Sequence, residues 1–194
     1  MQLTPTSLAA ILAFTSTSLA APFTPRQSPL QSFQVTSVGV GTPSGRPESY
    51  PWASITASIT DPNEINFGPS EADGKDVIVP AGSKGINCVA KYFTRYPAEP
   101  PTGRKWPCDP VEKGYWTMEV LPGTSGSYAS GDFKLKFTHV ADALYLGKQY
   151  TASFVAEGGF KVGDNLSGSC GGSGVCGWGL APGKSPVEIA PTKV

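Results

Sequence analysis

The chain has 194 residues, of which 15 are Lys or Arg and 15 are Asp or Glu, so its formal net charge is zero. A neutral chain provides no large basic field, which argues against binding of nucleic acid or of an anionic membrane surface. Hydrophobic residues make up 39% of the chain, enough for one core, and the length is typical of one domain. No heptad pattern or repeat of about 20–50 residues is visible, which excludes a coiled coil or a solenoid.

Residues 1–20 have the pattern of a secretory signal peptide. An apolar run over 8–14 is followed by Ser18-Leu19-Ala20, which places small residues where signal peptidase requires them. A segment that spans a bilayer needs about 20 apolar residues, and this run is far shorter. No Lys or Arg precedes it, so the α-amino group supplies the positive charge there. A buried apolar helix is the alternative interpretation.

A short pro-segment is predicted over residues 21–26. This segment ends in Pro25-Arg26 and resembles the fungal pro-segments that a Kex2-type protease removes. Cleavage there gives a mature start at Gln27, and a start at Ala21 is the alternative. No later stretch approaches membrane-spanning length. We therefore expect residues 30–194 to form a single β domain that is secreted and extracellular, with no membrane partner.

The cysteines predict two disulfides and no metal site. Four cysteines form an even set, which in a small secreted chain indicates disulfide bonding. Three pairings are open, and we favour the one with short, separate loops, Cys88 with Cys108 and Cys170 with Cys176. The spacing excludes zinc, because no Cys-x-x-Cys is present and His139 is the single histidine. We expect no metal and no cofactor.

The body of the chain alternates apolar and polar residues with a period of two, which is typical of strands with one face in water. Residues 132–140 are the clearest case, because Phe133, Leu135 and Phe137 share one face and Lys134 lies on the other. Strands are predicted over residues 33–40, 52–60, 76–79, 86–93, 115–121, 132–140, 149–157 and 187–189.

The connections between these ranges are rich in turn formers. Examples are Asp61-Pro62-Asn63, Pro122-Gly123 and Gly158-Gly159. The longest irregular stretch, residues 97–110, contains five prolines and therefore cannot occupy a central strand. Strands at this spacing with no helix between them predict an all-β fold, an antiparallel β-barrel or sandwich with two disulfides.

Catalytic motifs are weak. Residues 172–177 match G-x-G-x-x-G without the strand and helix that a dinucleotide site needs, so we interpret them as a tight loop between Cys170 and Cys176. A hydrolase needs a base, and His139 continues the apolar face of its strand, which indicates a histidine with satisfied hydrogen bonds at a strand end. Glycoside hydrolysis needs two carboxylates facing each other about 5–10 Å apart. We expect no enzyme activity. The carboxylates considered are Glu64, Glu71, Asp73, Asp76, Glu112, Glu119, Asp132 and Glu157.

Aromatic residues are the stronger lead for binding. Trp52 lies opposite the face of its strand that carries Ile55 and Ile59, and Trp106 lies in the proline-rich stretch. Exposed rings stack on sugars or anchor a protein partner, and capping of the sheet edges is the alternative role. Asn165-Leu166-Ser167 is an N-glycosylation sequon in a Gly/Ser-rich loop, which makes Asn165 a predicted glycosylation site.

The strand-only body, the four cysteines and the leader together resemble the Alt a 1-like family of small secreted ascomycete proteins, described as allergens and as elicitors of plant defence. The resemblance extends over residues 33–181. Residues 148–155 are similar to the family's late strand. Cys88 and Cys108, with Lys105-Trp106-Pro107 just before the latter, resemble the family's first disulfide loop. Cys170-Gly171-Gly172, followed by Cys176, resembles its second disulfide loop.

The resemblance has three departures. Cys170 and Cys176 are closer together than the family's usual second pair, and Cys88 and Cys108 are farther apart. No additional N-terminal cysteine is present, so the disulfide-linked dimer found in part of the family is not implied. The resemblance implies a compact β-barrel without enzyme activity, and it carries over no catalytic residue.

We therefore expect a secreted fungal protein that acts by binding, as an effector, elicitor or allergen at the plant–fungus interface. Its expected partner is a host protein or a cell-wall glycan. A cell-wall polysaccharide-binding module that uses Trp52 or Trp106 is the alternative, and a glycoside hydrolase is the third hypothesis. The sequence leaves the oligomeric state open.

Overall fold

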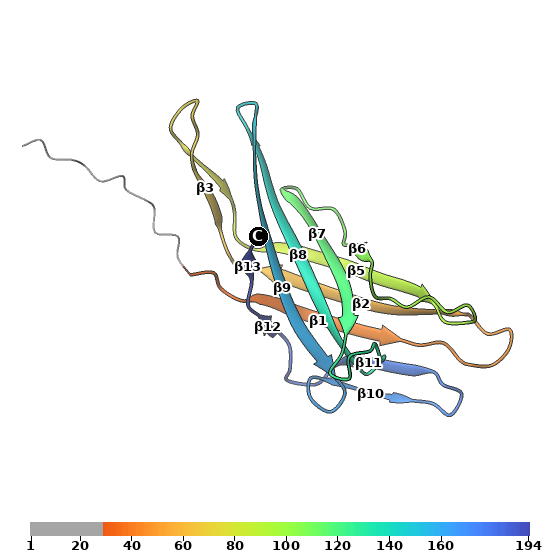
Figure 1. The fold of residues 1–194 in the computed structure, drawn as a ribbon. Coiled ribbons are helices and arrows are strands. Elements are labelled where there is room, and N and C mark those ends of the chain that lie inside the picture. The colour runs from red at the N-terminus through yellow and green to blue at the C-terminus, as the bar shows by residue number, and fades with distance from the viewer. Residues whose placement is uncertain (1–28) are drawn as a thin grey trace, which may run out of the picture.

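The computed structural model describes residues 29–194, which form β-strands without a helix (Figure 1). The predicted all-β class is confirmed. Within this range thirteen strands are present, β1 to β13, and all pairings between them are antiparallel. The predicted signal peptide over 1–20 and the pro-segment over 21–26 lie outside the described residues.

The larger sheet has six strands. Its main path runs β10-β11-β1-β2-β5, and β12 pairs with the first part of β1. The bounds are β1 Phe33–Gly41, β2 Trp52–Asp61, β5 Ser83–Phe93, β10 Leu166–Cys170, β11 Cys176–Leu180 and β12 Val187–Ile189.

The smaller sheet has five strands in the order β13-β9-β8-β7-β6. Its centre is the long hairpin of β8 and β9, whose strands have 14 residues each. The bounds are β6 Lys105–Pro107, β7 Gly114–Pro122, β8 Asp132–Tyr145, β9 Lys148–Lys161 and β13 Thr192–Lys193.

The two sheets face each other across one hydrophobic core. The predicted alternation is confirmed, since Ile55 and Ile59 of β2 and Phe133 and Phe137 of β8 are fully buried. Burial of each such side chain contributes about 1.5–3 kcal/mol. Hydrogen bonds join strands within each sheet, and β5 and β6 end their respective sheets. The arrangement is therefore a sandwich, one of the two architectures that the sequence left open.

A third, two-stranded sheet extends the sandwich at one end, where the hairpin of β3 (Ile65–Pro69) and β4 (Asp76–Val79) lies beside the tip of the β8–β9 hairpin (Figure 1). Side chains join the two hairpins, since the Tyr145 hydroxyl donates to Asp73 at 3.0 Å and the Lys148 ammonium lies 2.7 Å from Glu71. The two hairpins therefore form one end of the molecule.

The segment that carries β12 and β13 belongs to both sheets. Ile189 of β12 lies opposite Phe33 of β1, and Thr192 of β13 lies opposite Val155 of β9. Ser185 adds a hydrogen bond from its hydroxyl to the carbonyl of Thr36. This segment therefore links the two layers of the sandwich along one side.

The two predicted disulfides are confirmed. Cys88–Cys108 joins β5 to the segment that follows β6, across a separation of 20 residues. Cys170–Cys176 joins the facing ends of β10 and β11, across a separation of 6 residues. The first bond holds the proline-rich stretch against the sheet, as expected, and the second closes the glycine loop.

All eight predicted strands are present, and the remaining differences from the prediction have local causes. Gly158-Gly159 was predicted as a turn, which is wrong, because β9 continues through both residues to Lys161. Ile189 packs over Gly158, where an added Cβ would lie 2.5 Å from its Cγ2, so the glycine is a packing requirement. Strands β10 and β11 were not predicted, because Gly and Ser residues give them no apolar period.

Candidate functional site

An exposed aromatic cluster lies where β2 begins and β5 ends. Trp52 and Phe93 are paired across these strands, with ring centroids 5.3 Å apart in an edge-to-face arrangement. Tyr50 is 61% exposed and Trp52 is 38% exposed. The Lys91 ammonium lies 5.5 Å from the Tyr50 ring and 5.6 Å from the Trp52 ring. We call Tyr50, Trp52, Lys91 and Phe93 the Trp52 patch.

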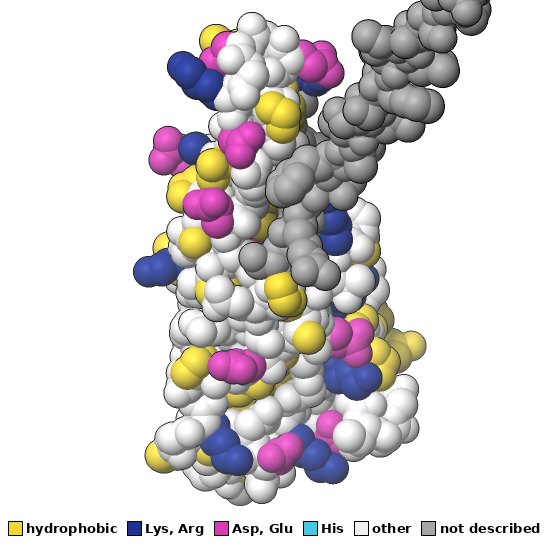
Figure 2. Space-filling model, turned by 90° about the vertical axis from the view of Figure 1, so that its left-hand side faces the viewer, with side chains coloured by type: hydrophobic (Ala, Val, Ile, Leu, Met, Phe, Trp, Pro, Cys, Tyr) yellow, Lys and Arg dark blue, Asp and Glu magenta, His cyan; other side chains and the backbone are white. Residues whose placement is uncertain are grey.

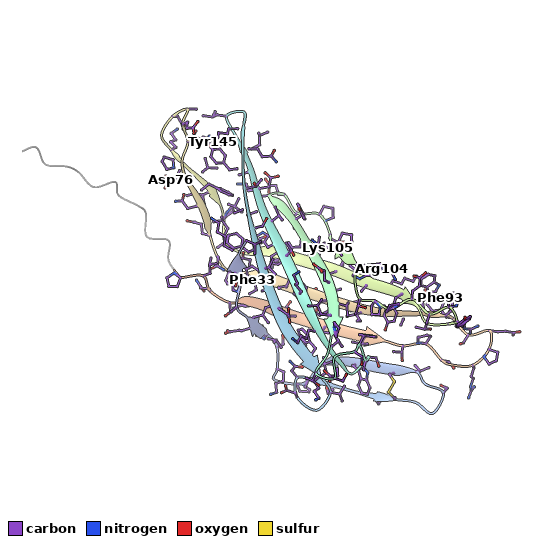
Figure 3. The ribbon with its side chains drawn as sticks, in the orientation of Figure 1. Phe33, Asp76, Phe93, Arg104, Lys105 and Tyr145 are labelled. Carbon is purple, nitrogen blue, oxygen red and sulfur yellow. A yellow bond between two sulfur atoms is a disulfide. The ribbon has the colours of Figure 1, made fainter. Side chains whose placement is uncertain are left out.

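The strand period explains how the chain builds this patch. Tyr50 and Trp52 are separated by Pro51, and Ala53, the next residue, is buried. The same alternation on β5 buries Ala90 and Tyr92 and leaves Lys91 and Phe93 on the outer face. Figure 3 labels Phe93 at the end of the sandwich remote from Tyr145. Trp52 was placed on the outer face by sequence, but Lys91 and Phe93 were not singled out, because their approach depends on strand register.

The positive charge of Lys91 is not neutralised by a neighbouring acid. Among residues 29–194, the ion pairs closer than 4.0 Å do not include Lys91. The contacts with the two rings are of the cation–π kind, worth about 0.5–1 kcal/mol at an exposed site. Lys91 therefore offers a positive charge to a ligand.

A strip of small residues continues from the patch across the six-stranded sheet. One register row holds Lys91, Ser54 and Gly41 and then crosses to β11 and β10 at Gly177 and Ser169. The next row has the same character. It comprises Val89, Thr56, Gly39, Gly179 and Ser167. We call the Gly, Ser and Thr residues of these two rows the Gly/Ser face.

Trp106, the second predicted binding tryptophan, lies in the other sheet. It belongs to the edge strand β6, pairs with Met118 of β7 and packs against the core. Its indole N–H donates to the carbonyl of Pro101 at 3.3 Å, and the Arg104 guanidinium lies 5.0 Å from its ring. Trp106 is therefore not part of the Trp52 patch. Its role is structural, because it holds the proline-rich stretch.

His139 is buried between the sheets. Its side chain is 1% exposed, and Nδ1 lies 2.8 Å from Oδ2 of Asp61. The imidazole stacks on Trp116 at a centroid distance of 4.3 Å, and Asn63 donates to the other Asp61 oxygen. The prediction of satisfied hydrogen bonds holds for Nδ1 but is wrong for Nε2, which is buried and has no partner among residues 29–194. The predicted position at a strand end is also wrong, because β8 continues to Tyr145.

Several carboxylates considered for catalysis belong to exposed ion pairs or turns. Glu119 lies 3.4 Å from Lys136, and Glu157 lies 2.9 Å from Lys134. Hydrogen bonding and charge from Lys148 lower the pKa of Glu71.

In the turn after β7, hydrogen bonds from Thr124 lower the pKa of Asp132. Tyr145 shows the reverse effect, because its hydrogen bond to Asp73 raises the pKa of the phenol.

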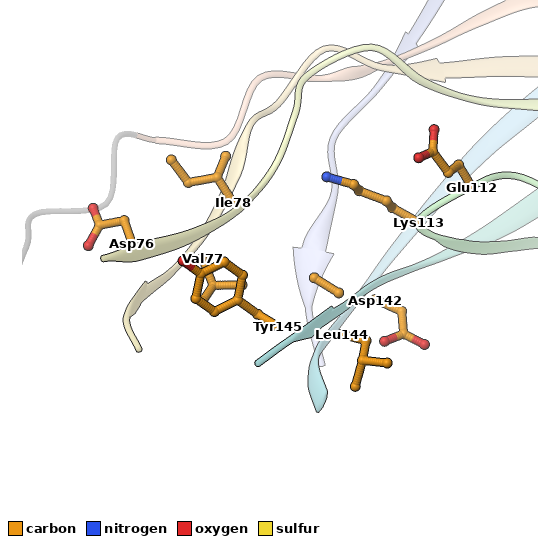
Figure 4. A pocket seen from close by; sticks show the side chains of 9 residues that line it. Asp76, Val77, Ile78, Glu112, Lys113, Asp142, Leu144 and Tyr145 are labelled. Carbon is orange, nitrogen blue, oxygen red and sulfur yellow. The ribbon is translucent and has the colours of Figure 1, made fainter. Parts of the chain in front are cut away.

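An open groove of about 450 Å³ lies between β4 and the end of β8 (Figure 4). It brings together Asp76 and Glu112, both considered from sequence, with Asp142, which was not. Figure 4 shows Lys113 between Asp76 and Glu112. Figure 2 views the molecule from the side away from the Trp52 patch, where charges of both signs are interspersed and apolar side chains are scattered. The acidic residues that line this groove, Asp76, Glu112 and Asp142, therefore share it with the positively charged Lys113.

Asn165, the predicted glycosylation site, has a structural role in the connection between β9 and β10. Its side-chain oxygen accepts from the N–H of Lys161 at 2.9 Å, and its amide nitrogen donates to the carbonyl of Gly159 at 2.9 Å. These two bonds account for an asparagine at this position without a glycan. Glycosylation of Asn165 stays a prediction.

Within residues 29–194 there is no group of three or more His, Cys, Asp or Glu side chains placed to bind a metal ion. The same residues include no helix long and apolar enough to cross a membrane. Comparisons with protein-family models, with curated proteins and with solved structures gave no match.

Proposed function

We propose that this protein is a secreted, non-enzymatic binding protein of effector or elicitor type, and that the Trp52 patch is its contact surface at the plant–fungus interface. The observation that carries the proposal is a group of rings at one end of the six-stranded sheet, in which Tyr50 and Trp52 are exposed and Phe93 is half-buried. Tryptophan and tyrosine dominate the binding energy of many interfaces, because they present large rigid surfaces at low entropic cost.

Two further observations support the proposal. The leader expected over residues 1–26 and the two disulfides suit an extracellular protein. The resemblance to the Alt a 1-like family supports a role toward plants, including recognition as an elicitor or an allergen. The disulfide Cys88–Cys108 joins β5, which carries Lys91 and Phe93, to the neighbouring sheet and so keeps the patch in one geometry.

Infiltration of the purified protein into leaves tests this function. We expect an oxidative burst or necrosis at micromolar protein, and its loss in Trp52→Ala. Tyr115→Ala is the matched control, because Tyr115 is 54% exposed and lies on the other sheet. A full response from Trp52→Ala, or no response from the parent protein, would contradict the proposal.

A cell-wall polysaccharide-binding module is the second candidate, and the Gly/Ser face favours it. Hydroxyl side chains such as Ser54 and Thr56 extend from the aromatic patch along the sheet, and sugars bind through ring stacking combined with hydrogen bonds. Sedimentation with chitin, cellulose and glucan separates this candidate from a protein-binding effector. Release of reducing sugar from the same polymers would instead indicate the glycoside hydrolase.

A further inference from the structure

We propose that the Trp52 patch and the adjoining rows of the Gly/Ser face bind an acidic polysaccharide, a chain of uronic acid residues. In this arrangement Lys91 pairs with a sugar carboxylate while Tyr50 and Trp52 stack on the apolar faces of the pyranose rings. The inference rests on the proposed binding function and names the ligand class.

The first argument for an anionic ligand is the charge on the outer face of the six-stranded sheet. Among the six strands of this sheet, the charged residues are Asp61, Lys84, Lys91 and Glu188. Asp61 is buried against His139, and Glu188 lies in the register row of Lys84, away from the row of Lys91. The charge beside the exposed rings is thus the positive one of Lys91, and the complementary ligand there is an anion.

The loops next to the patch contain more cations than acids. Arg95 donates to the carbonyl oxygens of Ser49 and Arg46, so a second and a third cation lie at the entrance to β2. The acids are the exposed Glu48 and Glu99, which donates its N–H to the carbonyl of Phe93 and is paired with Arg104 at 3.1 Å. The Trp52 end therefore has an excess of positive charge around its rings, although the whole chain is neutral.

The second argument, for a long ligand, is the shape of the Gly/Ser face. Neighbouring strands lie about 4.8 Å apart, so the row from Lys91 to Ser169 extends about 19 Å. Beyond Lys91 the row holds only Ser and Gly, and Gly177 has no other atom within 4 Å of the position of an added Cβ. Its φ lies outside the left-handed region, so the fold does not require glycine there. A strand glycine without a structural reason is typical of a surface that another chain approaches closely.

Together these features favour a long anion over other ligands. A neutral glucan would leave Lys91 without a carboxylate, and a small anion would leave the Gly/Ser face unused. A polymer with one carboxylate in each sugar residue uses the rings, the ammonium and the open row at the same time.

Polygalacturonate and the same polymer after methyl esterification are the test ligands, because esterification removes the charge and keeps the chain. We expect the secreted protein to bind the acid form at least about tenfold more tightly, because the acid form alone gives Lys91 a charged hydrogen-bond partner. Lys91→Met should remove this preference, and Lys84→Met, the control on the same strand, should keep it. The affinity for the acid form should fall as salt rises.

Three outcomes would overturn the inference: equal affinity for the two polymers, an unchanged preference in Lys91→Met, or no binding to either. Thermal unfolding of each variant checks that the fold is intact. A leaf response that depends on Trp52 without polyuronate binding would leave the proposed function standing with a protein as partner. Absence of both would reject the function as well.

Discussion

The two outer faces of the sandwich differ, although the same alternation builds both. On the five-stranded sheet, one register row holds Lys105, Glu119, Lys136 and Glu157, so opposite charges lie side by side. Lys136 pairs with Glu119 at 3.4 Å. The corresponding outer face of the six-stranded sheet has exposed rings, small residues and a lysine without an acidic partner.

This difference shows where a ligand is expected. On the five-stranded face, Lys136 pairs with Glu119 and Lys134 with Glu157, as on an ordinary protein surface. On the six-stranded face, Lys91 has no acidic partner among the described residues, and it lies beside exposed rings at the end where Trp52 and Phe93 meet, which is where we propose that a ligand binds. Both faces enclose the same core, so substitutions can separate stability from binding.

The largest effect is expected in the interior that both faces share. His139→Ala would leave Oδ2 of the buried Asp61 carboxylate without its imidazole partner, although Asn63 still donates to Oδ1, and this loss costs about 3–5 kcal/mol in the free energy of unfolding. Urea unfolding measures this loss. Thr138→Ala, on the outward side of the same strand, is the control and should change stability far less. A loss below about 1 kcal/mol in His139→Ala would show that the pair is not an important link between the sheets.

The two disulfides should differ in a predictable order. Loop entropy gives about 3 kcal/mol for the 20-residue closure by Cys88–Cys108 and about 2 kcal/mol for the 6-residue closure by Cys170–Cys176. Double Cys→Ala variants of each pair, compared by urea unfolding, test this. The Cys88 variant should also weaken ligand binding, because β5 carries Lys91. The reverse order of stabilities would contradict the prediction.

Two glycines sharpen the comparison of the faces. Gly177 on the six-stranded face and Gly159 on the five-stranded face both have open space around an added Cβ. Substitution of either by Ala should raise stability by about 0.5–1 kcal/mol. Gly177→Gln should weaken polyuronate binding by obstructing the row, whereas Gly159→Gln should bind as the parent does. Equal binding by the two Gln variants would place the ligand elsewhere.

The smallest effect concerns two lysines in different surroundings. Lys136→Met removes a partner of Glu119 and should lower the free energy of unfolding by about 0.2–1 kcal/mol. Lys91→Met removes no ion pair and should leave stability unchanged within about 0.5 kcal/mol. For polyuronate binding we expect the opposite order, with a loss in Lys91→Met and no change in Lys136→Met. Thermal unfolding at low and high salt checks the first part, because added salt should reduce the difference between Lys136→Met and the parent.

The features predicted correctly are those that local pattern determines. The alternation of apolar and polar residues was sufficient to predict the strands β2 and β4 and the outward position of Trp52. The disulfides followed from cysteine number and loop length. Asp61 illustrates the limit, because it stands in a turn-like Asp-Pro-Asn sequence and its partner His139 lies 78 positions later.

The site was predictable only in part, for the same reason. Lys91 and Phe93 join Trp52 through the β2–β5 register, which depends on a bulge between Ala57 and Ile59. The rows of glycine and serine have no apolar period, so β10 and β11 were interpreted as parts of a loop. Their strand structure follows from pairing with β1, a contact between distant parts of the chain.

The segment of β12 and β13 has a consequence for biosynthesis. Ser185 bonds to Thr36, which lies 149 positions earlier, and Ile189 completes the pairing of Phe33. While the polypeptide is still being translated, the first half of β1 therefore has an unpaired edge until residue 189 leaves the ribosome. Closure of the sandwich on this side is therefore a late step of folding, and that edge is open to pairing with another chain until then.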